Sequence, residues 1–375
     1  MEMNKEQNFE SKCHGKVLLL GGYLILFKKY YGWVISSSPS IKATIIMSES
    51  ASHNKITVVS NQFSYEAQFE MIPFSKVSGE WNPFIAESLN VVSFIASIMN
   101  CGYLLSSKSF LLEINADPEF YTSGKTGLGS SSALICSIIS AFFNYLQISD
   151  ERILHFTCQL ANSRAQKKIG SGFDIAAALF GSQLYSIKES DLLKSLLNET
   201  INDITVQELQ EEISNTVWST PVRRMELPSH YHLILCQGGE GTDTRSFVRS
   251  FHSWYESDIE NGKQKMEELF CIVQQSVKLF IDQNRAELRK LSRELRDFWL
   301  RTSEAIGVEI MPSNIYSLLN EVTDTCEDVV FSCVPGAGGY DAFYFIVEKP
   351  TYEEATEYLS SHFPNLLIIP AQKYP

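Results

Sequence analysis

The pattern of apolar and polar residues predicts a chain of mixed strands and helices. Residues 17–20 form a short, wholly apolar run between glycines, which is typical of a strand buried on both faces. Segments rich in β-branched residues follow, interrupted by Ser, Asn and Pro. We expect antiparallel strands and hairpins there, at residues 33–38, 40–47 and 55–60, and a further strand at 110–115.

Helical spacing of apolar residues begins after Pro83, whose missing N–H costs nothing in the first turn of a helix. Helices are predicted at residues 85–99, 133–143, 150–168, 260–282, 285–306, 312–325 and 350–362. Mixed charges along 260–306 indicate solvated helix faces with i,i+4 pairs. The remaining predicted strands are 232–237, 329–334, 343–347 and 366–369.

Composition narrows the class of protein. The 375 residues carry a net charge of −13, which argues against sequence-independent binding of nucleic acid. No apolar run has the length of a membrane span, and residues 1–10 lack the apolar core of a signal peptide. The eight cysteines show no C-x-x-C spacing, so we interpret them as buried free thiols of a reduced compartment. We therefore expect a cytoplasmic protein with neither nucleic-acid nor membrane partners.

A change in composition predicts two domains. Charged and amide residues dominate between residues 188 and 228, and we place the junction there. The predicted domains are 9–225 and 226–375.

A glycine-rich loop at residues 123–132 opens one of the predicted helices. Such a loop offers free backbone N–H groups and a positive dipole end to a phosphate. It is not a Walker A loop, because Glu119 stands where that motif needs glycine. Taken alone, it is also consistent with a loop that merely begins a buried helix.

Two charged residues stand beside other glycine motifs. Lys16 lies at the mouth of the first apolar strand, where a single lysine is commonly just a solvated strand end. Asp174 follows Gly170 and Gly172, where it either caps the next helix or points into a site.

Three glycine motifs in order resemble the signature motifs of the GHMP kinases. They are Gly15-Lys16 with Gly21-Gly22-Tyr23, Gly127-Leu128-Gly129-Ser130-Ser131, and Pro335-Gly336-Ala337-Gly338-Gly339-Tyr340-Asp341, and Asp174 stands between the second and third. Within this superfamily the strings Asn82-Pro83-Phe84-Ile85 and Lys168-Ile169-Gly170-Ser171-Gly172-Phe173-Asp174 are similar to the eukaryotic phosphomevalonate kinases.

The resemblance implies an α+β fold of two domains. The N-terminal domain would be of the ribosomal S5 domain 2 type and the C-terminal domain ferredoxin-like, with the active site between them. The implied partners are ATP, Mg²⁺ and 5-phosphomevalonate, in the mevalonate pathway of isoprenoid and sterol biosynthesis. A monomer or homodimer is expected.

The resemblance also implies roles for individual residues. Lys16 and Asp174 would be catalytic, and Ser130 or Ser131 would reach Mg²⁺. The ATP-binding residues would be Lys125, Thr126, Gly127, Leu128, Gly129, Ser130, Ser131 and Ser132. Besides Lys16 and Asp174, the substrate-binding residues would be Tyr23, Ser171, Thr244, Gly336, Ala337, Gly338 and Gly339, with the last four closing over the acceptor's phosphate through backbone N–H groups.

Alternatives remain open from the sequence. The chain is also compatible with another GHMP small-molecule kinase, such as a mevalonate kinase, or with a GHMP-fold protein that binds ligand without catalysis. No acid occurs between Ala161 and Asp174, so the sequence leaves the second protein ligand of magnesium unassigned.

Overall fold

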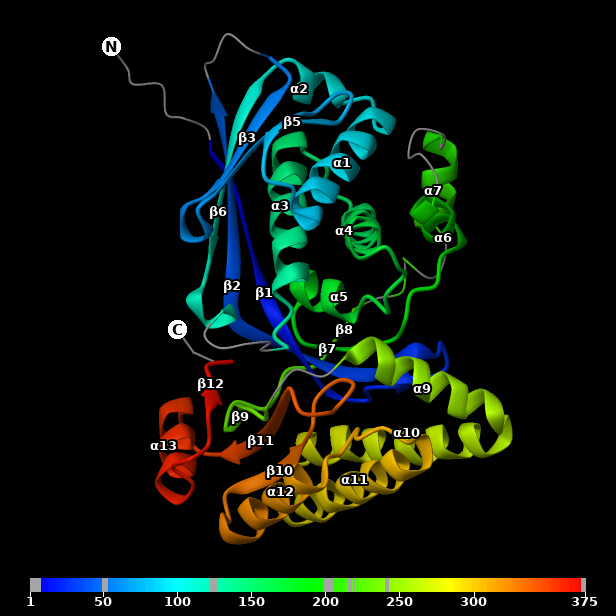
Figure 1. Cartoon of the computed structure of the whole chain (residues 1–375), viewed down its shortest axis with the longest axis vertical. Helices are drawn as coiled ribbons and strands as arrows, with labels where there is room; N and C mark the ends of the chain where they lie inside the picture. Colours follow the sequence, from blue (N-terminus) through cyan, green and yellow to red (C-terminus); the bar gives the residue numbers. More distant parts are fainter. Residues whose placement is uncertain are drawn as a thin grey trace.

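The computed structural model describes residues 8–48, 53–121, 127–198, 205–214, 218, 220, 222–239 and 243–371. Figure 1 shows two groups of elements stacked along the long axis, one around each of two sheets. The predicted α+β class is confirmed.

The first sheet has eight strands and is antiparallel except where β3 runs parallel to β6. Its strands are β1 (Asn8–Leu20), β2 (Gly32–Ser48), β3 (Lys55–Ser60), β4 (Tyr65–Glu70), β5 (Ser75–Gly79), β6 (Ser109–Ala116), β7 (Gln183–Tyr185) and β8 (Arg223–Arg224). The order is β5-β4-β3-β6-β2-β7-β8, with β1 pairing β2.

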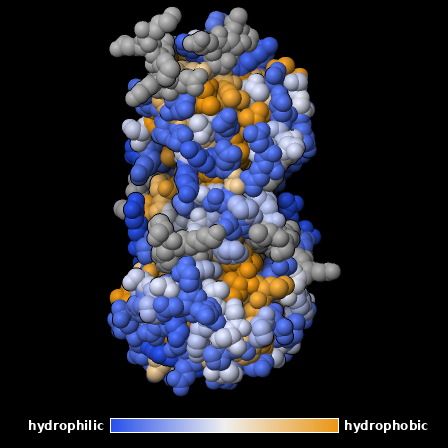
Figure 2. All heavy atoms as spheres, turned by 90° about the vertical axis from the view of Figure 1, so that its left-hand side faces the viewer, coloured by the Kyte–Doolittle hydropathy of each residue, from blue (hydrophilic) through white to orange (hydrophobic). Residues whose placement is uncertain are grey.

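Helices cover one face of this sheet (Figure 1). They are α1 (Pro83–Ile98), α2 (Gly102–Ser106), α3 (Ser130–Leu146), α4 (Glu151–Gln166), α5 (Phe173–Phe180), α6 (Asp191–Asn198) and α7 (Val206–Ser214). Burial alternates along β3, as expected when only one face of an antiparallel sheet meets the core. Figure 2 shows many hydrophilic side chains on the opposite, uncovered side.

The second sheet has four strands in the order β10-β11-β9-β12. Its elements are β9 (Tyr231–Gln237), α9 (Thr244–Ser257), α10 (Ile259–Ile281), α11 (Arg285–Ile306), α12 (Ser313–Thr325), β10 (Val329–Cys333), β11 (Ala342–Glu348), α13 (Tyr352–His362) and β12 (Ile368–Ile369). The chain passes from the first sheet to the second between Arg224 and Tyr231. The domain boundary at 225/226 stays a prediction.

Strand β2 differs from its prediction. Two strands separated by Pro39 were expected, but β2 is one strand of 17 residues. The register of β1 against β2 shifts between His14 and Lys16, which pair with Ser40 and Ser36. Pro39 therefore lies within a bulge of β2, where three residues face Gly15 alone and its missing N–H leaves no ladder hydrogen bond unmade.

Strand β1 is also longer than predicted. It has 13 residues, whereas only the four apolar ones were predicted. The first half of the strand alternates between exposed and partly buried positions, so it contains no apolar run that would have marked it as a strand. The β2 bulge lies opposite Gly15, the residue directly before Lys16.

The cysteines are all free, as predicted. Six are buried, but Cys101 is half-buried and Cys271 is exposed, so the expectation of uniformly buried thiols is wrong for these two. Within the described ranges, no helix has the length and apolar character needed to cross a membrane.

A buried arginine joins α11 to α12 and β10. Arg296 is fully buried and donates to Ser292 Oγ (2.7 Å), to Ser332 O and Oγ (3.1 and 2.7 Å) and to Asn320 Oδ1 (2.9 and 3.1 Å). Removing the guanidinium would leave several buried acceptors without donors, and each costs about 1–3 kcal/mol.

We predict that Arg296→Ala lowers the free energy of unfolding by about 3 kcal/mol or more in urea titration. Arg293→Ala is the matched control on the same helix, because Arg293 makes an exposed ion pair with Asp324 and its loss costs less than about 1 kcal/mol. Equal losses for the two variants would contradict the structural role of Arg296.

Candidate active site

A cavity of about 740 Å³ lies where the two groups of elements meet. Its walls come from β1 and the turn after it, the loop before α3, the end of α4 and its connection to α5, α9, and the loop 335–342. The sequence-predicted residues that line it are Lys16, Tyr23, Gly127, Ser171, Asp174, Thr244, Gly336, Ala337 and Gly338. Nine residues from five segments of the chain therefore meet around one cavity.

Lys16 is held where the strand meets the glycine loop. Its backbone N–H donates to Leu128 O (2.7 Å), and its Nζ donates to Gly127 O (2.6 Å). Its ammonium lies 5.2 Å from the centre of the Phe173 ring. Gly129 has φ 77°, a left-handed conformation that favours glycine, and a Cβ at that position would lie 2.9 Å from Lys16 Cε.

Burial lowers the pKa of Lys16, while the nearby carboxylate of Asp174 acts in the opposite direction. No ion pair within 4.0 Å joins Lys16 to Asp174 among the described residues. One of the three ammonium donors is used by Gly127 O, so two remain for a ligand.

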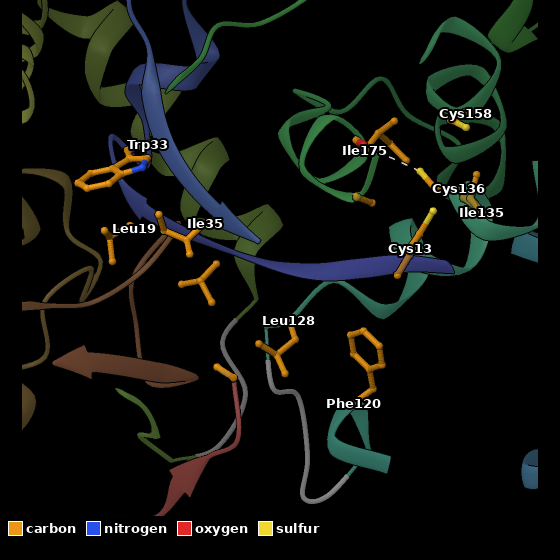
Figure 3. Packing of buried hydrophobic residues seen from close by; sticks show 14 of the residues in the cluster. Cys13, Leu19, Trp33, Ile35, Phe120, Leu128, Ile135, Cys136, Cys158 and Ile175 are labelled. Carbon is orange, nitrogen blue, oxygen red and sulfur yellow. Dashed lines mark hydrogen bonds between the residues drawn. The ribbon is translucent and has the colours of Figure 1, made fainter. Parts of the chain in front are cut away.

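Asp174 lies in the first turn of α5 and lines the cavity. Gly172 is the N-cap, so Asp174 is not the capping residue. Tyr185 fixes the preceding loop by donating its hydroxyl to Ser171 O (2.6 Å). Figure 3 shows Cys136 of α3 pointing at the Ile175 carbonyl, 3.9 Å away. The carboxylate is thus carried by a short helix fastened at its first turn.

The start of α3 is built to receive an anion. Its N-cap, Gly129, has φ 77° and no side chain with which to cap the helix, so the first N–H groups of α3 suit an anion. Ser130 and Ser131 are half-buried and lie beside the cavity wall formed by Gly127, without lining it themselves. Lys125 and Thr126 lie outside the described residues.

Two predicted ATP contacts are restricted by the fold. The Leu128 side chain is fully buried in the core, below β1 in Figure 3, so a ligand can meet only its backbone. Ser132 is buried as well, and its hydroxyl donates to Gly129 O (2.7 Å) inside the first helical turn. The assignment of Leu128 and Ser132 to ATP binding stays a prediction.

The loop 336–339 also differs from its prediction. Gly336 N–H donates to Leu18 O, Gly338 N–H to Pro335 O, and Gly339 N–H to Ile310 O, at 2.8–3.0 Å. Only Ala337 keeps a free N–H among the four. The expectation that all four N–H groups meet the acceptor's phosphate is therefore wrong, and Gly339 does not line the cavity.

Sequence reasoning missed most of the basic lining. Lys168, Arg245, Arg249 and His252 all line the cavity, and three of them come from α9. Burial lowers the pKa of Lys168, and Arg245 lowers it further, whereas Asp174 and Asp243 raise it. The available signal was the i, i+4, i+7 spacing of Arg245, Arg249 and His252, which places them on one face of a helix.

Acidic residues are scarce in this lining. Asp174 and Asp341 are the acids that line the cavity within the described part of the chain, and no cluster of three His, Cys, Asp or Glu residues suited to a metal occurs there. A resident metal cage is thus absent from the described residues, whereas a phosphate-bound Mg²⁺ needs only one or two protein ligands.

Comparisons with known proteins agree with this geometry. The family model described as "GHMP kinases N terminal domain" matches residues 105–182. Phosphomevalonate kinase, peroxisomal, from Arabidopsis thaliana is 24% identical, covering 96% of this chain and 94% of that protein. Phosphomevalonate kinase from Candida albicans is 27% identical, covering 89% and 88%.

A solved structure shares the fold. Streptococcus pneumoniae phosphomevalonate kinase in complex with phosphomevalonate and AMPPNP superposes with a TM-score of 0.69 at 15% identity, covering 96% of this chain and 98% of that chain. The same three glycine motifs and Asp174 surround the cavity described above. Residues 105–182 thus match the GHMP kinase N-terminal domain, and the chain is similar to phosphomevalonate kinases over most of its length.

Proposed function

We propose that this chain transfers the γ-phosphoryl group of ATP to the phosphate of (R)-5-phosphomevalonate, giving ADP and (R)-5-diphosphomevalonate. The observation that carries the proposal is the cavity itself. It places Lys16 and Asp174 beside further cations, so it suits two anionic substrates that must approach each other. The names of the curated relatives support the same reaction.

In this reaction an oxygen of the acceptor's phosphate bonds to the γ-phosphorus, and the bond from that phosphorus to the bridging oxygen of ADP breaks. The acceptor's second pKa is about 6, so it is mostly dianionic near neutral pH and needs no strong base. Catalysis then rests on positioning and on cations near the moving charge.

Lys16 has the position for the central role. Its two remaining N–H donors can reach the acceptor and the γ-phosphate at once, reducing their repulsion. Asp174 faces the same cavity, and its charge favours the protonated form of Lys16. We assign Asp174 to holding Lys16 charged and to placing the acceptor.

The backbone N–H groups at the start of α3 would hold the ATP phosphates. Mg²⁺ would be held by the hydroxyl of Ser130 or Ser131 together with Asp174, and when bound it neutralises phosphate charge. This donor set of one hydroxyl and one carboxylate fits a metal that keeps phosphate and water ligands.

Two expectations from the sequence stay predictions. The reaction is proposed to take place in the cytoplasm, although the Arabidopsis relative's name includes "peroxisomal". A monomer or a homodimer remains expected.

The test of the proposed function is ADP release measured with mevalonate, phosphomevalonate, homoserine and galactose at equal concentrations. We expect turnover only with phosphomevalonate, because the basic lining favours an acceptor with two anionic ends. Faster turnover of any unphosphorylated alcohol would contradict the proposal. Tight binding of phosphomevalonate with no turnover would indicate a non-catalytic binding protein instead.

A second prediction concerns the charge of Lys16. Lys16→Met keeps the stem that packs on Gly129 but deletes the ammonium, and we expect kcat to fall about 100-fold or more, with little change in Tm. Lys12→Met is the matched control, since Lys12 is an exposed residue of the same strand. If Lys16→Met is nearly as active as Lys12→Met, or is unfolded, then Lys16 is a structural residue.

A further inference from the structure

Helix α9 presents a basic row to the cavity. Arg245, Arg249 and His252 line it together with Val248, which places them on one helix face. The arginines that pair with acids in the described part of the chain are Arg152, Arg164, Arg285, Arg293 and Arg301. Arg245 and Arg249 are not among them. Both side chains are exposed and make no ion pair with an acid of the described residues, so their guanidinium groups are available to an anionic ligand in the cavity.

One end of this basic row lies nearer to the reacting groups than the other. Arg245 interacts electrostatically with Lys168, and Lys168 in turn with Asp174, so the start of α9 lies at the reacting end of the cavity. The later part of α9 packs against the segment after β1, where the Tyr23 and Phe251 rings lie 4.5 Å apart. With a rise of 1.5 Å per residue, Arg249 lies about 6 Å further along the axis than Arg245.

The acceptor matches this spacing. Six bonds separate its phosphorus from its carboxylate carbon, which corresponds to roughly 7 Å in an extended chain. When its phosphate lies between Lys16 and the Lys168–Arg245 end of the cavity, its carboxylate falls about one helical turn further along α9. That is the position of Arg249.

Other hydrogen-bond donors around the cavity are less suited to the acceptor's carboxylate. In the glycine loop, the N–H groups of Gly336 and Gly338 are already bonded within the protein. A guanidinium also matches a carboxylate better than an ammonium does, because two parallel N–H groups meet its two oxygens.

We propose that Arg249 binds the carboxylate of the acceptor and thereby selects acceptors that carry a second anion at this distance from the reacting phosphate. This inference rests on the proposed function. It assigns the distal end of the substrate to α9, an element that none of the three glycine motifs contains.

The test combines a variant with a substrate analogue. Wild type and Arg249→Gln are each assayed with phosphomevalonate and with its C1-carboxamide, which has the same shape without the charge. For wild type we expect kcat/KM to fall about 100-fold with the carboxamide. For Arg249→Gln with phosphomevalonate we expect a similar fall in kcat/KM relative to wild type, mostly through a higher KM. Replacing phosphomevalonate by the carboxamide should then lower kcat/KM of this variant by less than about 5-fold more.

Two further variants control for folding and charge. Arg224→Gln removes an exposed arginine of β8 and should match wild type with both substrates. Arg249→Lys keeps the charge without the planar fork and should recover about 10-fold of the loss seen for Arg249→Gln.

The outcomes separate this inference from the proposed function. If wild type does not turn over phosphomevalonate, both fail. If it does, but the losses from Arg249→Gln and from the carboxamide multiply independently, only the assignment of Arg249 is overturned. A loss of less than 3-fold for Arg249→Gln with phosphomevalonate overturns it as well.

Discussion

The contact between Gly22 and Gly336 is the constraint on which the cavity depends. A Cβ on Gly22 would lie 1.9 Å from Gly336 O, so only glycine permits this approach of two backbones that are distant in the sequence. Three hydrogen bonds fasten the same junction: Gly336 N–H to Leu18 O, Tyr344 hydroxyl to Leu19 O, and Tyr23 hydroxyl to Ala337 O, at 2.9–3.0 Å. The end of β1 and the loop after β10 therefore meet, and the cavity forms between them.

This junction explains the electrostatics of the site. Lys16 precedes it on β1, packed against Gly129 and partly removed from water, which lowers its pKa. A desolvated cation attracts anions more strongly than an exposed one, because less water screens it. The nearby carboxylate of Asp174 opposes this lowering of the pKa, and α9 contributes further positive charge to the lining of the cavity. The arrangement suits two phosphates that must be brought together.

The glycine motifs predicted the position of Lys16 and Asp174 well, because glycines mark close backbone approaches that a sequence displays directly. The sequence was less informative about hydrogen bonds across the fold. Gly339 was expected to bind a phosphate, but its N–H is taken by Ile310 O, a partner 29 positions away. Arg249 was missed for a related reason: on α9 alone it looks like a solvated charge, and only the folded chain places it in a cavity. Pro39 misled the strand prediction because it lies in a bulge of β2, and that bulge is set by the pairing with β1 in the folded chain.

The central claim is that the acceptor atom is a phosphate oxygen. Phosphorus NMR of the reaction of ATP with phosphomevalonate tests this most directly, because it reports the bond that has formed. The account predicts a product with two mutually coupled phosphorus resonances, as a P–O–P linkage requires, while ADP accumulates in equal amount. A product with two uncoupled phosphomonoester resonances would mean that a hydroxyl had been phosphorylated, and would contradict it.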